Sequence, residues 1–351
     1  MFRLVMISNT PCFVVKIRLT HKFFIIYFHR VKRQCLVNDS NSLLKGRNIV
    51  MLNFLPKMLL GIMSFLLLSL NVIFWCTIVF IFALLKLALP IKPMRVILDH
   101  ILNGIGANWI SCNSGWMRLT QKTKWDVQGV DGLTYRGWYL VNSNHQSWVD
   151  IFVLQHLLNR KIPLLKFLIK QELIYVPVIG LAWWALEFPL MRRHSVEYLA
   201  KHPEMRGKDL ETMRKACAKF SRIPTSIMNF PEGTRFTKAK HDKQGSPYQF
   251  LLKPRAGGLA LSLSTMGEKF QSLLDVTIVY PDGAPGFWDF LCGRVSRIMV
   301  RMQQLPIPKQ FIGSDYENDP ECRDSFQQWL SELWKEKDGQ IGQLYVEARS
   351  A

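Results

Sequence analysis

The chain has 351 residues, 49% of them hydrophobic, an ordinary fraction for a globular protein with one large domain or two small ones. Its formal net charge of +19 suits anionic lipid headgroups, coenzyme phosphates or nucleic acid, and charge alone does not choose among them. The seven cysteines include no C-x-x-C pair and the eight histidines show no ligand spacing, which argues against a disulfide framework and against a zinc site. We therefore expect a reducing compartment and no metal.

Residues 1–50 form a basic extension that lacks a clean helical period. They carry nine Lys or Arg residues against one Asp, so +8 of the net charge lies there and +11 in the rest of the chain. The segment that begins at Met51 is typical of the N-terminus of a membrane-anchored bacterial protein. We therefore expect residues 1–50 to be either a mis-called upstream extension or a disordered tail.

An uncharged run of 28 residues, Met58 to Leu85, lies between Lys57 and Lys86. It is longer than the ~20 residues that cross a bilayer. As one straight helix it would measure about 42 Å. We expect a membrane segment, either a tilted helix or a bent segment that enters one leaflet and returns. Basic residues on both sides leave the orientation open, whereas the basic remainder of the chain favours a cytoplasmic domain.

Residues 51–118 are expected to combine this anchor with an amphipathic helix, because apolar residues recur at helical spacing between Val96 and Trp109. From Trp125 onward, short apolar runs alternate with helical stretches. The runs lie at residues 138–141, 225–230, 275–280 and 298–302. Strands interleaved with helices predict an α/β domain over residues 119–351, with a mostly parallel sheet flanked by helices.

Two further helices are predicted within this domain. A polar stretch at residues 198–219 is typical of a solvated helix. The C-terminal stretch predicts an amphipathic helix that packs on the domain. Its apolar stripe consists of Phe326, Trp329, Leu330, Leu333 and Trp334.

The heptapeptide NHQSWVD, Asn144 to Asp150, is the first candidate for chemistry. Its histidine, His145, and its one carboxylate residue, Asp150, are five positions apart, so on one helix they would not share a face. They meet only if His145 lies in a strand-to-helix turn and Asp150 in the first helical turn. Ser147 and Asp150 fit a capping box at that point. A histidine with a carboxylate behind it is the minimal unit for removing a proton from an alcohol; the alternative is that Asp150 only caps the helix.

The hexapeptide FPEGTR, Phe230 to Arg235, follows the second apolar run directly. Gly233 permits a sharp turn, and the planar fork of Arg235 suits phosphate. Glu232 cannot bind a phosphate because both are anions, so we expect it to orient Arg235 or the loop. The alternative is an ordinary turn closed by a Glu–Arg pair.

Together and in this order, NHQSWVD and FPEGTR resemble the blocks of the glycerolipid acyltransferases, which include lysophosphatidic acid and lysophospholipid acyltransferases. The resemblance covers roughly residues 51–345, and within the family the chain is most similar to the bacterial YihG-like acyltransferases. Two weaker blocks fit: residues 188–193 place Arg193 at the end of an apolar strand, and residues 279–281 form a strand end with Pro281. Glu187, Pro189 and Tyr280 differ from the residues usual in these blocks and bear on the choice of acyl acceptor.

The resemblance implies a fold and a reaction. It implies the glycerolipid acyltransferase fold with an N-terminal membrane helix or helical hairpin. It also implies transfer of an acyl chain from acyl-CoA or acyl carrier protein to the free hydroxyl of a lysophospholipid such as 1-acyl-glycerol-3-phosphate. The acyl donor is then a co-substrate, and no cofactor is implied. The partners are membrane lipids and the lysophospholipid acceptor, at a bacterial inner membrane with a cytoplasmic catalytic domain.

The resemblance also implies residue roles. His145 acts as the general base and Asp150 fixes its tautomer. Arg193 and Arg235 hold the acceptor phosphate, while the loop around them is shaped by Glu232 and Gly233. The residues expected to support the motifs are Asn144, Ser147, Pro231, Thr234 and Pro281. Two alternatives stay open: glycerol-3-phosphate or another polar hydroxyl compound as the acceptor, and a basic, membrane-tethered binding protein without catalysis.

Overall fold

The computed structural model describes residues 12–19, 22–29, 52–89, 91–191, 223–316 and 318–350. The chain divides into two compact units, Met1–Val50 and Met51–Ala351. In the first unit, strands β1 (Cys12–Leu19) and β2 (Lys22–His29) pair in antiparallel fashion. Whether residues 1–50 belong to the native protein stays a prediction.

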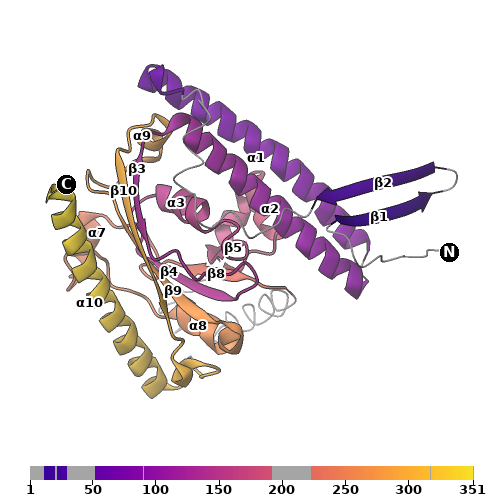
Figure 1. Ribbon diagram of the computed structural model, residues 1–351. Helices are drawn as coiled ribbons and strands as arrows, with labels where there is room; N and C mark the ends of the chain where they lie inside the picture. Colours follow the sequence, from indigo (N-terminus) through magenta and orange to yellow (C-terminus); the bar gives the residue numbers. More distant parts are fainter. Residues whose placement is uncertain are drawn as a thin grey trace. The chain divides into compact units, whose positions relative to one another are not determined.

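A six-stranded sheet forms the centre of the second unit, in the order β3-β10-β9-β4-β8-β5 (Figure 1). The strands are β3 (Lys124–Gln128), β4 (Tyr139–Ser143), β5 (Leu165–Phe167), β8 (Ser226–Asn229), β9 (Ser272–Val279) and β10 (Arg297–Leu305). β10 pairs antiparallel with β9, and the other four pairs are parallel. Every residue of β4, β8 and β9 is buried, as expected for strands covered on both faces. The predicted α/β class with a mostly parallel sheet is confirmed.

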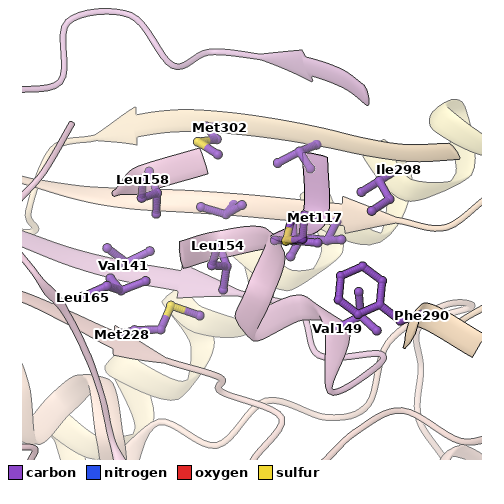
Figure 2. Close-up of a cluster of buried hydrophobic side chains, with 14 of the residues drawn as sticks. Met117, Val141, Val149, Leu154, Leu158, Leu165, Met228, Phe290, Ile298 and Met302 are labelled. Carbon is purple, nitrogen blue, oxygen red and sulfur yellow. The ribbon is translucent and has the colours of Figure 1, made fainter. Parts of the chain in front are cut away.

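Two hydrophobic clusters cover the two faces of this sheet. Helices α8 (Gly257–Met266) and α10 (Pro320–Ser350) pack on one face. The other face is covered by α3 (Val149–Leu158) and by the end of α2 (Lys92–Thr120). Leu140 joins the first cluster and Val141 the second, because successive side chains of a strand point to opposite faces. Figure 2 shows the second cluster, where Leu154 and Leu158 of α3 lie over the strands.

Apart from the long helix α1 (Lys57–Ala88), the other elements of the described residues are short. They are η1 (Leu52–Phe54), β6 (Ile169–Lys170), η2 (Gln171–Tyr175), α4 (Ile179–Ala185), β7 (Leu190–Met191), α7 (Lys238–Gln244), η4 (Gly267–Lys269), α9 (Phe287–Leu291) and η5 (Lys309–Phe311). β6 and β7 form a small parallel pair of their own. The polar helix predicted at residues 198–219 lies outside the described residues.

Helix α1 (Lys57–Ala88) covers the predicted membrane segment as one continuous helix. Helix α2 runs beside it (Figure 1) and is longer than the stretch between Val96 and Trp109 that periodicity indicated. In the described part of the chain, α1 is the one helix long and apolar enough to cross a membrane. Only 17% of an apolar 18-residue stretch of α1 is buried, whereas the core helix of a soluble protein would be mostly buried.

Helix α10 is attached to the sheet by a buried ion pair as well as by its apolar stripe. Lys337 Nζ donates to Asp275 Oδ2 at 2.8 Å and to Thr277 Oγ1 at 3.1 Å. Asn142 Nδ2 donates to the other oxygen of Asp275 at 3.1 Å. The Lys337 side chain is 0% exposed, so each charge of the pair depends on the other for neutralisation.

Lys337→Met is expected to lower the free energy of unfolding by about 3–5 kcal/mol, because it leaves the Asp275 charge buried without its partner. Lys335→Met is the matched control, since Lys335 lies on the same helix and is exposed. It should change the stability by no more than about 0.5 kcal/mol. Urea unfolding followed by circular dichroism measures both variants, and equal midpoints for the two would contradict the predicted role of the pair.

Candidate active site

Three segments that sequence reasoning singled out follow three neighbouring strands of the sheet. His145 follows β4, the FPEGTR loop follows β8, and Tyr280 follows β9. β4 lies between β8 and β9 and pairs parallel with both. The carboxyl ends of parallel strands lie at the same edge of a sheet, which is where open α/β folds bind their ligands. The topology therefore brings the segments together although they are far apart in the sequence.

The imidazole of His145 and the carboxylate of Asp150 are in direct contact. His145 lies in the turn between β4 and α3, and Asp150 lies in the first turn of α3, as their spacing requires. His145 Nδ1 donates to Asp150 Oδ2 at 2.8 Å. The Asp150 side chain is 0% exposed, whereas the His145 side chain keeps 12% exposure. The pair thus has the arrangement of a base with an orienting carboxylate behind it.

The Asp150 carboxylate also accepts from the backbone of the turn before helix α3, whose N-cap, Trp148, has no side-chain capping hydrogen bond. Oδ2 accepts from the backbone N–H of Gln146 at 2.7 Å and of Ser147 at 2.9 Å. Oδ1 accepts from the Tyr280 hydroxyl at 2.6 Å. The backbone donors of the turn therefore hold the carboxylate where it meets the imidazole.

Asn144 and Ser147 tie the turn to the end of β9 and to the loop behind it. Asn144 Nδ2 donates to the Ile278 carbonyl at 2.8 Å, and Asn144 Oδ1 accepts from the Ile278 N–H at 2.9 Å. Ser147 Oγ donates to the Pro285 carbonyl at 2.6 Å and accepts from the Val149 N–H at 3.1 Å. Both side chains are engaged with backbone groups, which suits residues that hold the turn.

Glu232 connects the FPEGTR loop to the NHQSWVD turn. Its Oε1 accepts from the His145 N–H at 2.8 Å, and its Oε2 accepts from the Leu252 N–H at 3.0 Å. The Phe236 N–H donates to the His145 carbonyl at 2.7 Å, so this loop holds the His145 backbone on both sides. Burial raises the pKa of the Glu232 carboxyl to about 8, against the lowering effect of its two backbone donors.

The placement of Glu232 distinguishes between its two expected roles. Among the described residues, no hydrogen bond or ion pair joins Glu232 to Arg235, and the Glu232 side chain is wholly buried. Glu232 therefore shapes the loop, the second of its two expected roles, and does not orient Arg235 or line a substrate surface. The physical reason is that two inward-facing backbone N–H groups need an acceptor in the core.

Aromatic rings cover one face of the imidazole. The ring of Phe230 stacks on His145 with centroids 4.0 Å apart and planes 15° from parallel. Phe167 of β5 lies next, 6.1 Å from Phe230. Sequence reasoning gave neither ring a role, although Phe230 opens the FPEGTR hexapeptide. The stack leaves His145 little freedom to turn away from Asp150.

Arg235 is exposed, and its guanidinium lies over the Trp148 ring, 4.9 Å from the centroid. Lys240 Nζ donates to Thr234 Oγ1 at 2.8 Å and to the Arg235 carbonyl at 3.0 Å. Gly233 has a φ of 67°, a left-handed conformation that favours glycine. The loop that holds His145 therefore carries a guanidinium group, and the ammonium group of Lys240 in α7 contacts the same loop; both groups are suited to an anion.

The other expected site residues either support the backbone of the loops or lie outside the described residues. Pro231 is buried, and its carbonyl accepts from the Arg255 N–H at 2.8 Å. Pro281 directly follows Tyr280, in a turn where the Gly283 N–H donates to the Tyr280 carbonyl at 3.0 Å. Arg193 lies outside the described residues. Within the described residues, no group of three or more His, Cys, Asp or Glu side chains could hold a metal ion.

Tyr280 is a further residue of the site whose contact the sequence did not predict. In the sequence, Tyr280 stands out only because it differs from the residue usual before the proline of this block. The feature that could have indicated its role is a hydroxyl directly after the strand that pairs with β4. Burial, and then the Asp150 charge, raise the pKa of Tyr280 well above its ordinary value, so its hydroxyl stays protonated and donates.

Comparisons with known proteins point to acyltransferases. Residues 124–279 match the family model described as Acyltransferase. The 1-acyl-sn-glycerol-3-phosphate acyltransferase gamma of Mus musculus is 28% identical over 182 residues, which are 49% of this chain and 44% of that protein. The delta form of Mus musculus is 26% identical over 184 residues, 49% of this chain and 43% of that protein. The chain thus spans about half the length of the curated relatives it matches.

A plant relative and a solved structure extend the comparison. The probable 1-acyl-sn-glycerol-3-phosphate acyltransferase 5 of Arabidopsis thaliana is 26% identical over 59% of this chain and 53% of that protein. The crystal structure of the 1-acyl-sn-glycerophosphate (LPA) acyltransferase PlsC from Thermotoga maritima is 16% identical, with a TM-score of 0.42 over 79% of this chain and 95% of that chain. Residues 124–279, which match the Acyltransferase family model, contain both NHQSWVD and FPEGTR.

Proposed function

We propose that the protein is a membrane-bound O-acyltransferase that moves a fatty acyl chain from a thioester donor to the free hydroxyl of a lysophospholipid such as 1-acyl-glycerol-3-phosphate. The family domain and the names of the similar proteins support the reaction and the class of acceptor. The observation that carries the mechanism is the hydrogen bond of 2.8 Å from His145 Nδ1 to Asp150 Oδ2. Acyl-CoA or acyl carrier protein is the donor, and the reaction needs no further cofactor.

The His145–Asp150 pair supplies general base catalysis. Because Nδ1 carries the proton shared with Asp150, Nε2 carries the free electron pair. Nε2 takes the proton of the acceptor hydroxyl while the hydroxyl oxygen attacks the thioester carbonyl, and Asp150 stabilises the imidazolium that forms. The new C–O bond replaces the C–S bond, and the proton passes from His145 to the departing sulfur. No acyl-enzyme is needed, because the thioester is already activated.

Arg235 is proposed to bind the acceptor phosphate. Its guanidinium is exposed and held over Trp148, a ring that belongs to the same turn as the catalytic pair. A planar guanidinium offers two parallel donors to a phosphate, which fixes the direction of the lipid headgroup. Arg193 is proposed as a second phosphate ligand, as the resemblance implied.

The membrane contact is proposed to be the outer face of α1. This helix has 32 residues and a length of about 48 Å, against about 30 Å for the hydrocarbon core of a bilayer. Its first turns lie against α9, where Gly61 meets Trp288, and near its end Ala83 packs with Ala185 of α4. A helix packed on its domain near both ends suits a position in the plane of one leaflet. The catalytic domain would then lie at the cytoplasmic surface of a bacterial inner membrane.

The proposed reaction is tested by incubating purified membranes that contain the protein with labelled acyl-CoA or acyl carrier protein and a panel of acceptors. Lysophosphatidic acid and other lysophospholipids should be acylated, and membranes without the protein are the control. Acylation of glycerol-3-phosphate alone would replace the proposed acceptor with the alternative one. No transfer to any acceptor would refute the function.

His145→Ala is expected to lower the rate of acyl transfer by about 10²–10⁴-fold, because the general base is lost. His100→Ala is the matched control, since His100 is an exposed histidine of α2. Thermal melting should show that both variants stay folded. Wild-type rates in His145→Ala would end the proposed mechanism.

Arg235→Ala is expected to raise the KM for a phosphorylated acceptor with little change in kcat, because the guanidinium binds ground state and transition state alike. Arg235→Lys should recover only part of the affinity, since an ammonium lacks the planar fork. Arg323→Ala removes an exposed arginine of α10 and serves as the control. An unchanged KM with a reduced kcat would remove Arg235 from phosphate binding.

Sided labelling tests how α1 meets the membrane. Single cysteines are introduced at Phe54 and Ile91, exposed positions before and after α1, in a chain whose native cysteines are replaced by alanine. In sealed vesicles, a membrane-impermeant maleimide should label both positions from the same side. Labelling from opposite sides would mean that α1 crosses the bilayer and would contradict the in-plane position.

A further inference from the structure

We propose that Tyr280 is a positioning residue for the His145–Asp150 pair, and that its hydroxyl sets how strongly the Asp150 carboxylate holds the imidazole proton. The inference rests on the proposed function, and it assigns a role to a residue that departs from the usual sequence of its block. Tyr280 touches the pair only through Asp150 and is almost fully buried, with 1% exposure, so it is not itself a catalytic residue.

The first argument is the division of the carboxylate between two partners. Oδ2 of Asp150 accepts from His145 Nδ1, and Oδ1 accepts from the Tyr280 hydroxyl at 2.6 Å. With one oxygen held from each side, the carboxylate cannot rotate without breaking a bond. The distance lies in the range of 2.5–2.7 Å that is usual when a hydroxyl donates to an ionised carboxylate.

The second argument is that no other donor to Asp150 Oδ1 is found among the described residues. Among the described residues, Tyr280 is the one hydrogen-bond donor to Oδ1, and Asp150 is 0% exposed. A buried ionised oxygen without a donor keeps its full cost of desolvation. The ordinary alternative, a buried tyrosine that merely needs an acceptor, would be satisfied by any backbone carbonyl, whereas this hydroxyl points at the charged member of the catalytic pair.

The third argument concerns the anchoring of the turn. Asn144 and Ser147 already tie it to the end of β9 and to the following loop through backbone groups. Tyr280 comes from the same end of β9, but it alone reaches a functional side chain. Its hydroxyl is therefore not required to anchor the turn. Its position instead suits a role in setting how strongly Asp150 holds the imidazole proton.

The consequence for catalysis has a definite sign. A donor on Oδ1 draws charge away from the carboxylate and weakens its hold on the imidazolium. Without the hydroxyl, the imidazolium is held more tightly and loses its proton only at higher pH. The acid limb of the pH–rate profile, which follows the base in its working form, then moves to higher pH.

Other charged groups near the pair do not determine the acid limb of the pH–rate profile. Among the described residues, the other charged side chains that contact the two motifs are Glu232 and Arg235 of the FPEGTR loop and Lys240 of α7. Because burial raises the pKa of Glu232 to about 8, its titration belongs to the alkaline side of the profile. The acid limb is thus the part of the profile that reports the His145–Asp150 pair.

The test is Tyr280→Phe, which removes the hydroxyl and keeps the ring. Tyr139→Phe is the matched control, because Tyr139 is an equally buried tyrosine of β4 whose hydroxyl accepts from the Thr134 N–H at 2.9 Å. With a lysophospholipid acceptor, Tyr280→Phe should lower kcat by about 10-fold with KM changed by no more than about twofold. Its acid limb should move to higher pH, and that of Tyr139→Phe should not.

A second variant and a second measurement cover the case of a poorly folded Tyr280→Phe. Incorporation of 3-fluorotyrosine at position 280 keeps the hydrogen bond and makes the hydroxyl a stronger donor, so the acid limb should move to lower pH. The ring signals of ¹³C-labelled histidine, with that of His145 assigned by its loss in His145→Ala, report the same shifts without turnover.

The outcomes separate the inference from the function on which it rests. An unshifted acid limb and an unshifted His145 signal in Tyr280→Phe and in the fluorotyrosine protein would overturn the inference and leave the proposed function intact. Shifts equal to those in Tyr139→Phe would also overturn it, because a general loss of stability would then explain them. A wild-type protein that acylates no acceptor refutes the function, while the histidine signals still decide the role of Tyr280.

Discussion

The site depends on the burial of one carboxylate. An ionised carboxylate that is removed from water is costly unless its oxygens find donors. Asp150 is 0% exposed and finds four donors: the ring of His145, the backbone N–H groups of Gln146 and Ser147, and the hydroxyl of Tyr280. These donors come from the β4–α3 turn and from the end of β9, so satisfying the carboxylate fixes the position of the imidazole as well.

The parallel sheet makes this arrangement possible. β4 lies between β8 and β9, and the residues that follow these three strands meet at one edge. The loop after β8 holds the His145 backbone through Glu232 and Phe236, and it presents Arg235 beside Trp148. The apolar clusters on both faces keep the strand ends in register, which suits a site that needs its base and its cationic group at fixed positions.

Local patterns in the sequence predicted most of the fold and the contact between His145 and Asp150. The five-residue spacing of His145 and Asp150, with a capping serine between them, was enough to predict a turn followed by a helix. The roles of Glu232 and Tyr280 could not be predicted in this way, because their partners are set by the strand order and not by neighbours in sequence. Lys337 is a similar case, since a lysine in a polar helix is expected at the surface until the sheet places Asp275 beside it.

The central claim is that Asp150 holds the Nδ1 proton of His145 and leaves Nε2 free to accept a proton. The most direct measurement is ¹⁵N NMR of the neutral His145 ring, which distinguishes the two tautomers without turnover. The account predicts a protonated Nδ1 and a bare Nε2. A ring protonated at Nε2 has no free electron pair on that atom, and this result would contradict the mechanism.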